Sequence, residues 1–216
     1  MGGLEMRKRI LCFGDSNTWG YIPGKGERYP ENVRWTGVLT ELLAGEFTVV
    51  EEGLNGRTTV FSDRMEPERC GIDHVLPVVL SALPLDYMII MLGTNDMKSH
   101  FHVNAMESGY GMEELLLKVL YVLRTRKSEA RVILVSPVPI SPAEDPMFDE
   151  ESVRKSRELT LVYEKLAKDM NLLFLNASKI TNDIGLDGIH LTQEGHNKIG
   201  KALAELIKSC EKGDKL

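Results

Sequence analysis

The chain has 216 residues, of which 43% are hydrophobic and 27% are charged, a composition typical of a globular protein with one α/β domain over residues 1–216. Its net charge of -6 gives no basic surface for nucleic acid and little attraction to anionic membranes, so we expect neither as a partner. The three cysteines are too few and too widely spaced for a disulfide framework, and Cys12 lies in an apolar run typical of a core.

The amino-terminal segment contains no recognisable targeting signal. The basic stretch 7–9 precedes only four apolar residues, fewer than the core of a signal peptide requires. No apolar run is long enough to span a bilayer. We therefore expect a cytoplasmic protein, although an exported protein that had lost its signal would present the same sequence.

Short aliphatic runs, typical of buried strands, alternate with longer stretches that have apolar residues at helical spacing. In chain order the pattern predicts a strand at 10–13, a helix at 33–45, a strand at 47–50, a helix at 72–83, a strand at 87–92, a helix at 112–126, a strand at 131–135, a helix at 149–170, a strand at 172–175 and a helix at 193–211. This alternation predicts a three-layer α/β/α domain with a five-stranded parallel sheet. Function in such domains lies beyond the carboxyl ends of the strands.

One connection is unusually long and rich in proline. The segment 136–148 follows the fourth expected strand and contains Pro137, Pro139, Pro142 and Pro146. A loop this long and stiff is typical of a pocket wall or a subunit contact, and an ordinary surface loop is the alternative.

Four polar segments follow strand ends or precede the last helix. They are Gly14-Asp15-Ser16-Asn17, Gly53-Leu54-Asn55-Gly56, Gly93-Thr94-Asn95-Asp96 and Asp187-Gly188-Ile189-His190. Ser16 needs a base within hydrogen-bond reach, because a serine hydroxyl is a poor nucleophile at neutral pH. His190 can be that base, and Asp187 can hold its imidazole in the required tautomer. The order Ser, Asp, His along the chain therefore predicts a catalytic triad.

The same segments supply donors for the oxyanion that acyl transfer creates. Gly56 lacks a Cβ, so its N–H can approach a ligand closely. Asn95 brings a side-chain amide to the end of a buried strand, and the N–H of Ser16 is a third donor. We therefore expect an oxyanion hole made by Ser16, Gly56 and Asn95.

Each segment taken alone has a simpler explanation. A serine after Gly-Asp is commonly a helix N-cap, an Asp-x-x-His pair commonly starts a helix, and Asn95-Asp96 is typical of a capping turn. The histidines that compete with His190 are His74, His100, His102 and His196. His74 and His196 lie in helical stretches and are expected at the surface or in packing. The four segments together, each at an expected strand end or before the last helix, favour the catalytic interpretation.

The four segments resemble the sequence blocks that define the SGNH (GDSL-like) hydrolase superfamily. The longer stretches similar to its arylesterase and acyltransferase branch, of mycobacterial type, are RILCFGDSNTWG, RWTGVL, EEGLNGRTT, LPLDYMIIMLGTND and DGIHLT. The resemblance implies a flavodoxin-like sandwich and a serine esterase that hydrolyses short acetyl or aryl esters through an acyl-enzyme, with acyl transfer to alcohols as a further activity. It implies no metal and no organic cofactor. By the same resemblance, the triad is Ser16, Asp187 and His190, and the oxyanion hole is Ser16, Gly56 and Asn95.

Positions that line the substrate pocket in that branch are occupied here by Asn17, Tyr21, Asn55, Lys98, Phe148 and Ile189. Asn17 stands where the GDSL motif has leucine, and a polar neighbour of the nucleophile favours a polar or smaller substrate. Core packing explains Phe148 and Ile189 equally well, and a solvated charge is the commoner fate of a lone lysine such as Lys98. Members of the branch tend to assemble so that neighbours narrow the pocket. Together with the loop 136–148, this predicts a homo-oligomer.

Three other functions fit parts of the pattern. A metal-dependent phosphoesterase would use the Asp, Asn and His side chains as ligands, but no Asp-x-His or Gly-Asn-His element is present. A binding module without catalysis would share the fold, but the acidic segment after the first strand repels phosphate. A carbohydrate acetylesterase would have the same triad and differ only in pocket shape, so this alternative stays open.

Overall fold

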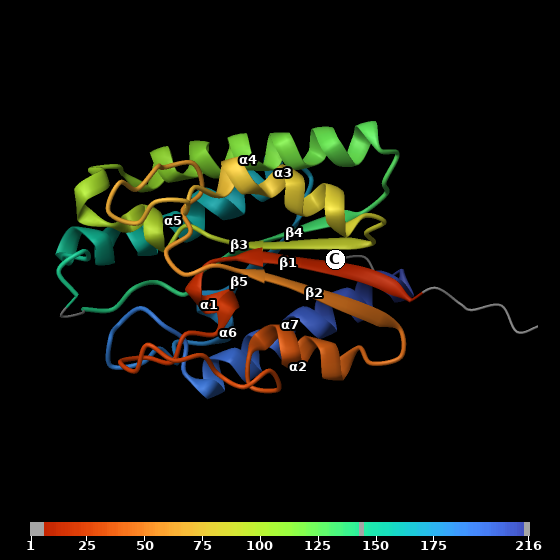
Figure 1. The fold of residues 1–216 in the computed structure, drawn as a ribbon, viewed down its shortest axis with the longest axis horizontal. Coiled ribbons are helices and arrows are strands. Elements are labelled where there is room, and N and C mark those ends of the chain that lie inside the picture. Colours follow the sequence, from red (N-terminus) through yellow and green to blue (C-terminus); the bar gives the residue numbers. More distant parts are fainter. Residues whose placement is uncertain (1–6, 143–144, 214–216) are drawn as a thin grey trace, which may run out of the picture.

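The computed structural model describes residues 7–142 and 145–213 and contains a five-stranded sheet covered by helices on both faces (Figure 1). The strands are β1 (Lys8–Gly14), β2 (Phe47–Gly53), β3 (Tyr87–Met91), β4 (Arg131–Ser136) and β5 (Leu173–Asn176). All neighbouring pairs are parallel, in the order β2-β1-β3-β4-β5. The expected parallel sheet is confirmed, with a strand at each expected place.

The register of the sheet brings three strand ends together. Gly14, the last residue of β1, pairs with Gly53 of β2 on one side and with Met91 of β3 on the other. Glycine is required at Gly14 because a Cβ there would lie 2.0 Å from the Thr18 hydroxyl oxygen and 2.8 Å from the Met91 carbonyl oxygen. The segments that follow β1, β2 and β3 therefore leave the same edge of the sheet, on the left in Figure 1.

Two groups of helices form the outer layers. Helices α3 (Gly71–Ala82), α4 (Ala105–Thr125) and α5 (Glu150–Asp169) cover one face, and α2 (Trp35–Leu42) and α7 (Gln193–Lys212) cover the other (Figure 1). Alternate residues of β1 enter two separate cores, Leu11 and Phe13 on the first face, Ile10 and Cys12 on the second. This period of two is that of a strand buried on both faces, and it places Cys12 in the core as expected.

The structure differs from the sequence-based expectation at helix starts and in single turns. Helix α4 begins at Ala105 rather than at 112, because Asn104 and Glu107 form a reciprocal capping box that extends the helix beyond its apolar periodicity. Single-turn elements were not expected, since they have no apolar period: α1 (Ser16–Trp19), α6 (Ala177–Ile180) and the 3₁₀ turns η1 (Asn95–Met97) and η2 (Ser99–Phe101).

His196 fastens α7 to the start of α2. Its side chain is fully buried, and its Nδ1 accepts the N–H of Trp35 at 3.2 Å. The Tyr29 ring packs edge-on against it. Burial, with a smaller contribution from the nearby Arg34, lowers the pKa of His196 to about 3. His196 is thus the packing residue expected at this position, while His74 is partly exposed at the surface.

Acid should therefore destabilise the fold through His196. The unfolded chain takes up a proton there near pH 6.5, whereas the folded chain does so only near pH 3. The stability due to the neutral, buried ring is fully present above 6.5 and falls as the pH drops toward 3, by about 3 kcal/mol at pH 4. In circular-dichroism melts from pH 7 to 4, we expect the wild type to lose its advantage in Tm over His196→Asn. A Tm difference that stays constant with pH would contradict this.

Candidate active site

Ser16, His190 and Asp187 form a continuous hydrogen-bonded relay. The Asp187 Oδ2 lies 2.9 Å from His190 Nδ1, and His190 Nε2 lies 2.9 Å from the Ser16 hydroxyl oxygen. With the Nδ1 proton directed to the carboxylate, Nε2 is free to accept the Ser16 proton. Of the five histidines, His190 is the one that contacts Ser16, so the arrangement matches that expected from the sequence.

The turn that carries Ser16 is built on the end of β1. Asp15 is the N-cap of α1, and its Oδ1 accepts the Asn17 N–H at 2.9 Å. This bond turns the chain sharply after Gly14 and makes Ser16 the first residue of the helix. Asp15 is 1% exposed, and burial raises the pKa of its carboxyl to about 6.

Asp187 shapes the loop that presents His190. Its Oδ1 accepts the N–H groups of Ile189 and His190 at 3.1 and 3.0 Å, and the Gly185 N–H donates to the His190 carbonyl oxygen at 2.8 Å. Burial raises the pKa of Asp187, but hydrogen bonds from the His190 ring and from these N–H groups outweigh it, and the net pKa is lowered. Asp187 therefore stays a carboxylate beside the imidazole.

Asn17 ties the turn of Ser16 to the loop of His190. Its Oδ1 accepts the Leu191 N–H at 2.9 Å, and its Nδ2 donates to the Ile189 carbonyl oxygen at 3.3 Å. Asn17 was expected to face the substrate, but its side-chain amide bonds to the backbone on either side of His190. The Tyr21 ring stacks on the imidazole, with centroids 4.2 Å apart, and so borders the site as expected.

The expected oxyanion donors lie beyond β2 and β3. Gly56 has a φ of +76°, a left-handed conformation that favours glycine. The Leu54 N–H donates to the Gly14 carbonyl oxygen at 3.1 Å, which holds this turn against the end of β1. Asn95 opens η1, and its Nδ2 donates to the Arg57 carbonyl oxygen at 3.1 Å. Within the described residues, the N–H groups of Ser16 and Gly56 donate to no protein acceptor.

The comparisons with known proteins agree with this geometry. A model of the GDSL-like lipase/acylhydrolase family matches residues 12–198. The chain belongs to this family. Similar solved structures include an aryl esterase of M. smegmatis, at 40% identity and a TM-score of 0.89, over 94% of this chain and 99% of that one. No curated protein matches the chain.

Two carbohydrate acetylesterases of Sinorhizobium meliloti are also similar to this acylhydrolase. The first is 37% identical, with a TM-score of 0.90, over 94% of this chain and 100% of that one. The second, a family member, is 31% identical, with a TM-score of 0.83, over 93% of this chain and 97% of that one. The acylhydrolase is thus a carboxylic ester hydrolase with the SGNH fold, and the implied flavodoxin-like sandwich is the architecture found.

Lys98 is a buried cation in this acylhydrolase, which corrects its interpretation as a solvated charge. Its side chain is 1% exposed, and its ammonium lies 3.2 Å from the Asp63 carboxylate and contacts that of Glu66. His100 also contacts Asp63, at 3.2 Å, so it is a partner of this cluster rather than of Ser16. Sequence reasoning missed Asp63 because it lies 35 residues before Lys98.

Glu66 brings this buried cluster against Gly56. A Cβ at Gly56 would lie 2.9 and 3.0 Å from the two carboxylate oxygens of Glu66. Glycine at this position therefore leaves room for the Glu66 carboxylate as well as allowing the positive φ. Glu66 thus lies between Lys98 and the turn of Gly56, and the Lys98 ammonium is paired with two carboxylates.

Arg57 is a second buried cation that sequence reasoning missed. Its guanidinium donates to the Gly14 carbonyl oxygen at 2.7 Å and lies 4.1 Å from the centroid of the Phe13 ring. Burial lowers the pKa of Arg57 to about 10. The position of Arg57 directly after Gly56 is the feature of the sequence that could have indicated its place near the site. Its side chain braces the ends of β1 and β2 against each other.

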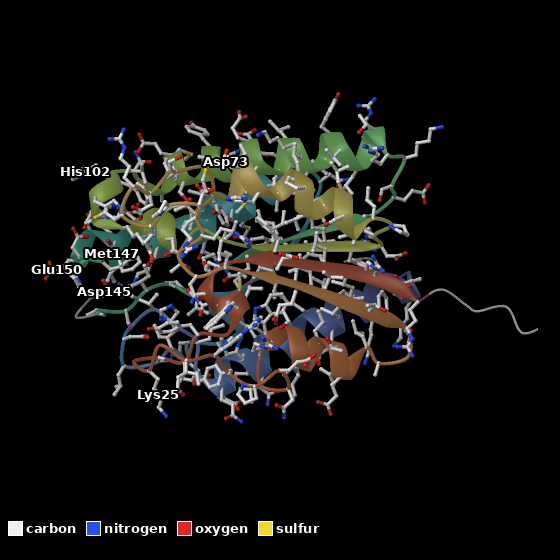
Figure 2. All side chains as sticks on the ribbon, in the orientation of Figure 1. Lys25, Asp73, His102, Asp145, Met147 and Glu150 are labelled. Atoms are coloured by element: carbon white, nitrogen blue, oxygen red, sulfur yellow. The ribbon has the colours of Figure 1, made fainter. Side chains whose placement is uncertain are left out.

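The remaining pocket candidates divide between the core and the site. Phe148 and Ile189 are 7% and 6% exposed and belong to the larger core cluster, which favours the packing interpretation. Asn55 is half-buried, and its Oδ1 has no hydrogen-bond partner within the described residues. His102 lies at the end of η2, on the side of the molecule where the strands end (Figure 2).

The proline-rich loop 136–148 borders the site, apart from residues 143–144, which lie outside the described residues. The Ser141 N–H donates to the Gly188 carbonyl oxygen at 2.9 Å, next to Asp187. The Met147 carbonyl accepts the Ser99 N–H at 2.8 Å, next to Lys98. Figure 2 labels Asp145 and Met147 at this edge of the molecule. The contacts support the pocket-wall interpretation.

No group of three or more His, Cys, Asp or Glu side chains in the part of the chain that the structure describes is placed to hold a metal ion. None of the helices in that part is both long and apolar enough to cross a membrane.

Removing the Lys98 charge should strongly destabilise the fold, because Asp63 would stay buried without its cation. We expect Lys98→Met to lower the free energy of unfolding by about 3–5 kcal/mol, measured by urea denaturation. Lys98→Met combined with Asp63→Asn should recover part of this loss. The matched control is Lys165→Met, whose pair with Asp169 is exposed and screened by solvent, so its loss should change stability little. Equal losses at Lys98 and Lys165 would contradict the buried role.

Proposed function

We propose that the chain is a serine esterase in which Ser16 is the nucleophile, His190 the general base and Asp187 its orienting acid. The observation that carries this proposal is the relay of two 2.9 Å contacts from Asp187 through His190 to Ser16. A carboxylate, an imidazole and a hydroxyl in this order are the groups that activate a serine at neutral pH.

The proposed reaction has two halves. The Ser16 oxygen bonds to the ester carbonyl carbon while His190 Nε2 takes the hydroxyl proton, and Asp187 stabilises the imidazolium. The N–H groups of Ser16 and Gly56 and the amide of Asn95 donate to the oxyanion. As the intermediate collapses, the imidazolium gives its proton to the leaving alcohol oxygen. Water then attacks the acyl-enzyme, and His190 takes its proton and returns it to Ser16.

Short acyl esters are the substrates we propose, with aryl or alkyl alcohols as leaving groups. The support is the similarity to an aryl esterase and the narrow setting of Ser16, which is 4% exposed. Acyl transfer belongs to the proposal wherever an alcohol replaces water in the second half-reaction. The second candidate, a carbohydrate acetylesterase, is supported by the acetylesterase neighbours. Rates on p-nitrophenyl acetate and on acetylated sugars distinguish the two.

Replacing the nucleophile should abolish the activity. We expect Ser16→Ala to lower kcat on p-nitrophenyl acetate by at least about 10³-fold, because no other hydroxyl among the described residues contacts His190. A fluorophosphonate should add to Ser16 in the wild type, as read by mass spectrometry of the labelled peptide. Ser81→Ala is the matched control, since Ser81 is exposed on α3. Wild-type turnover in Ser16→Ala would overturn the proposal.

We also propose a homo-oligomer. Its support is a row of exposed apolar side chains along one face of α4: Met106, Tyr110, Leu117 and Tyr121. The exposed fractions of these side chains range from 48% to 69%, and a second copy would bury them. Light scattering should give a multiple of the 24.2 kDa chain mass, and Tyr121→Glu should reduce it. A wild-type monomer would contradict this. A cytoplasmic location stays a prediction.

A further inference from the structure

Asp96 is a fully buried carboxylate that the proposed reaction does not use. It follows Asn95 in the turn after β3, and its exposed fraction is 0%. One carboxylate oxygen accepts the Thr59 N–H at 2.8 Å, and the other accepts the hydroxyls of Thr59 at 2.7 Å and Ser108 at 2.6 Å. Burial raises the pKa of Asp96 to about 6, so this carboxylate is held at a cost in free energy.

These hydrogen bonds join the two loops that carry the oxyanion donors. Thr59 belongs to the loop of Gly56, beyond β2, and Asp96 belongs to the turn of Asn95, beyond β3. A second bond between the same loops runs from the Asn95 amide to the Arg57 carbonyl oxygen. Ser108, on α4, fastens the joined loops to the helix layer.

The sheet itself does not connect these two loops. Because β1 lies between β2 and β3, no ladder hydrogen bond links the strands that end before Gly56 and Asn95. The distance between the two donors is therefore set by loop contacts across the end of β1. Of the loop-to-loop side-chain bonds at this point, those accepted by Asp96 are the shortest and the most deeply buried.

We propose that Asp96 is a positioning residue of the oxyanion hole, which clamps Thr59 and so fixes the Gly56 N–H relative to the Asn95 amide. The inference rests on the proposed function, in which these groups stabilise the oxyanion. Such donors accelerate the reaction only when they are already in place, and the loss of one costs roughly 10²–10³-fold. Misplacement by about 1 Å is a cost of similar order.

An aspartate suits this clamp because a carboxylate only accepts hydrogen bonds. Its two oxygens receive three donors from Thr59 and Ser108 without presenting an N–H that would need a partner. An asparagine retains the shape, and its amide can donate to the two hydroxyl oxygens while its carbonyl oxygen accepts the Thr59 N–H. Asparagine therefore preserves the clamp without the charge, whereas alanine removes both.

The test compares kcat and KM on p-nitrophenyl acetate for Asp96→Ala and Asp96→Asn. We expect Asp96→Ala to lower kcat by about 10²-fold with KM changed by less than about threefold, because the lost donors act in the transition state. Asp96→Asn should stay within about tenfold of the wild type. An Asp96→Ala enzyme with wild-type kcat would overturn the inference.

A milder change covers the case in which Asp96→Ala does not fold. Thr59→Val keeps the shape and the N–H but removes the hydroxyl bond to Asp96, so kcat should fall by about tenfold. Thr59→Ser should restore it. Asp86→Ala is the matched control, because Asp86 accepts a backbone N–H from Arg9 at the opposite end of the strands. It should lower Tm without changing kcat, and equal kcat in all these variants would overturn the inference.

A double-mutant cycle separates positioning from a general loss of structure. If Asp96 acts by setting the Gly56 N–H and the Asn95 amide at the right spacing, its replacement by alanine should lower kcat much less once the Asn95 amide is absent, in an Asn95→Ala background, while the loss in Tm persists. Additive effects on kcat would overturn the inference. Unchanged kcat in Asn95→Ala, with Ser16→Ala inactive, would instead overturn the oxyanion assignment itself, so the two failures are distinguishable.

Discussion

The parallel register that sets Gly14 between Gly53 and Met91 is the constraint on which the candidate site depends. It brings the segments after β1, β2 and β3 to one edge, where the turn of Ser16 meets the loops that carry Gly56 and Asn95. Parallel strands joined by helices all end on the same side, so a site can be assembled from loops distant in the chain. The loop of His190 completes the site from outside the sheet, and Asn17 holds it to the turn of Ser16.

The strands and the segments that carry the candidate triad could be predicted because their signals are local. A buried strand appears as an apolar run, and Ser16, Asn95 and His190 each lie in a short polar segment with a recognisable order. The partners of buried charges could not be predicted in this way. Lys98 resembles a surface lysine until the fold brings Asp63 to it, and Asp96 resembles a capping residue until Thr59 and Ser108 surround it. The early start of α4 was missed because a capping box carries no apolar period.

Several charged side chains near the relay are buried, although a packed core does not need charges. Lys98 and Asp96 are each nearly or fully buried, and Arg57 lies against an aromatic ring. Groups of this kind cost free energy of desolvation, which their hydrogen bonds only partly offset. Lys98 and Asp96 bond to the segment that follows Gly56, and Arg57 bonds to the end of β1. The fold thus accepts a loss of stability at the loops that carry the proposed N–H donors. Enzymes of many folds accept such a loss at their active sites.

The positions of Ser16 and His190 along the chain have a consequence for biosynthesis. The two residues are 174 positions apart, so the turn of Ser16 is made well before the loop of His190. During translation, β1 can pair with β2 and β3 long before residue 190 exists. Until residue 190 has been made, the Ser16 hydroxyl lacks the imidazole that it contacts in the folded chain. Under the proposed function, hydrolysis therefore begins only after the loop of His190 has folded against the turn of Ser16.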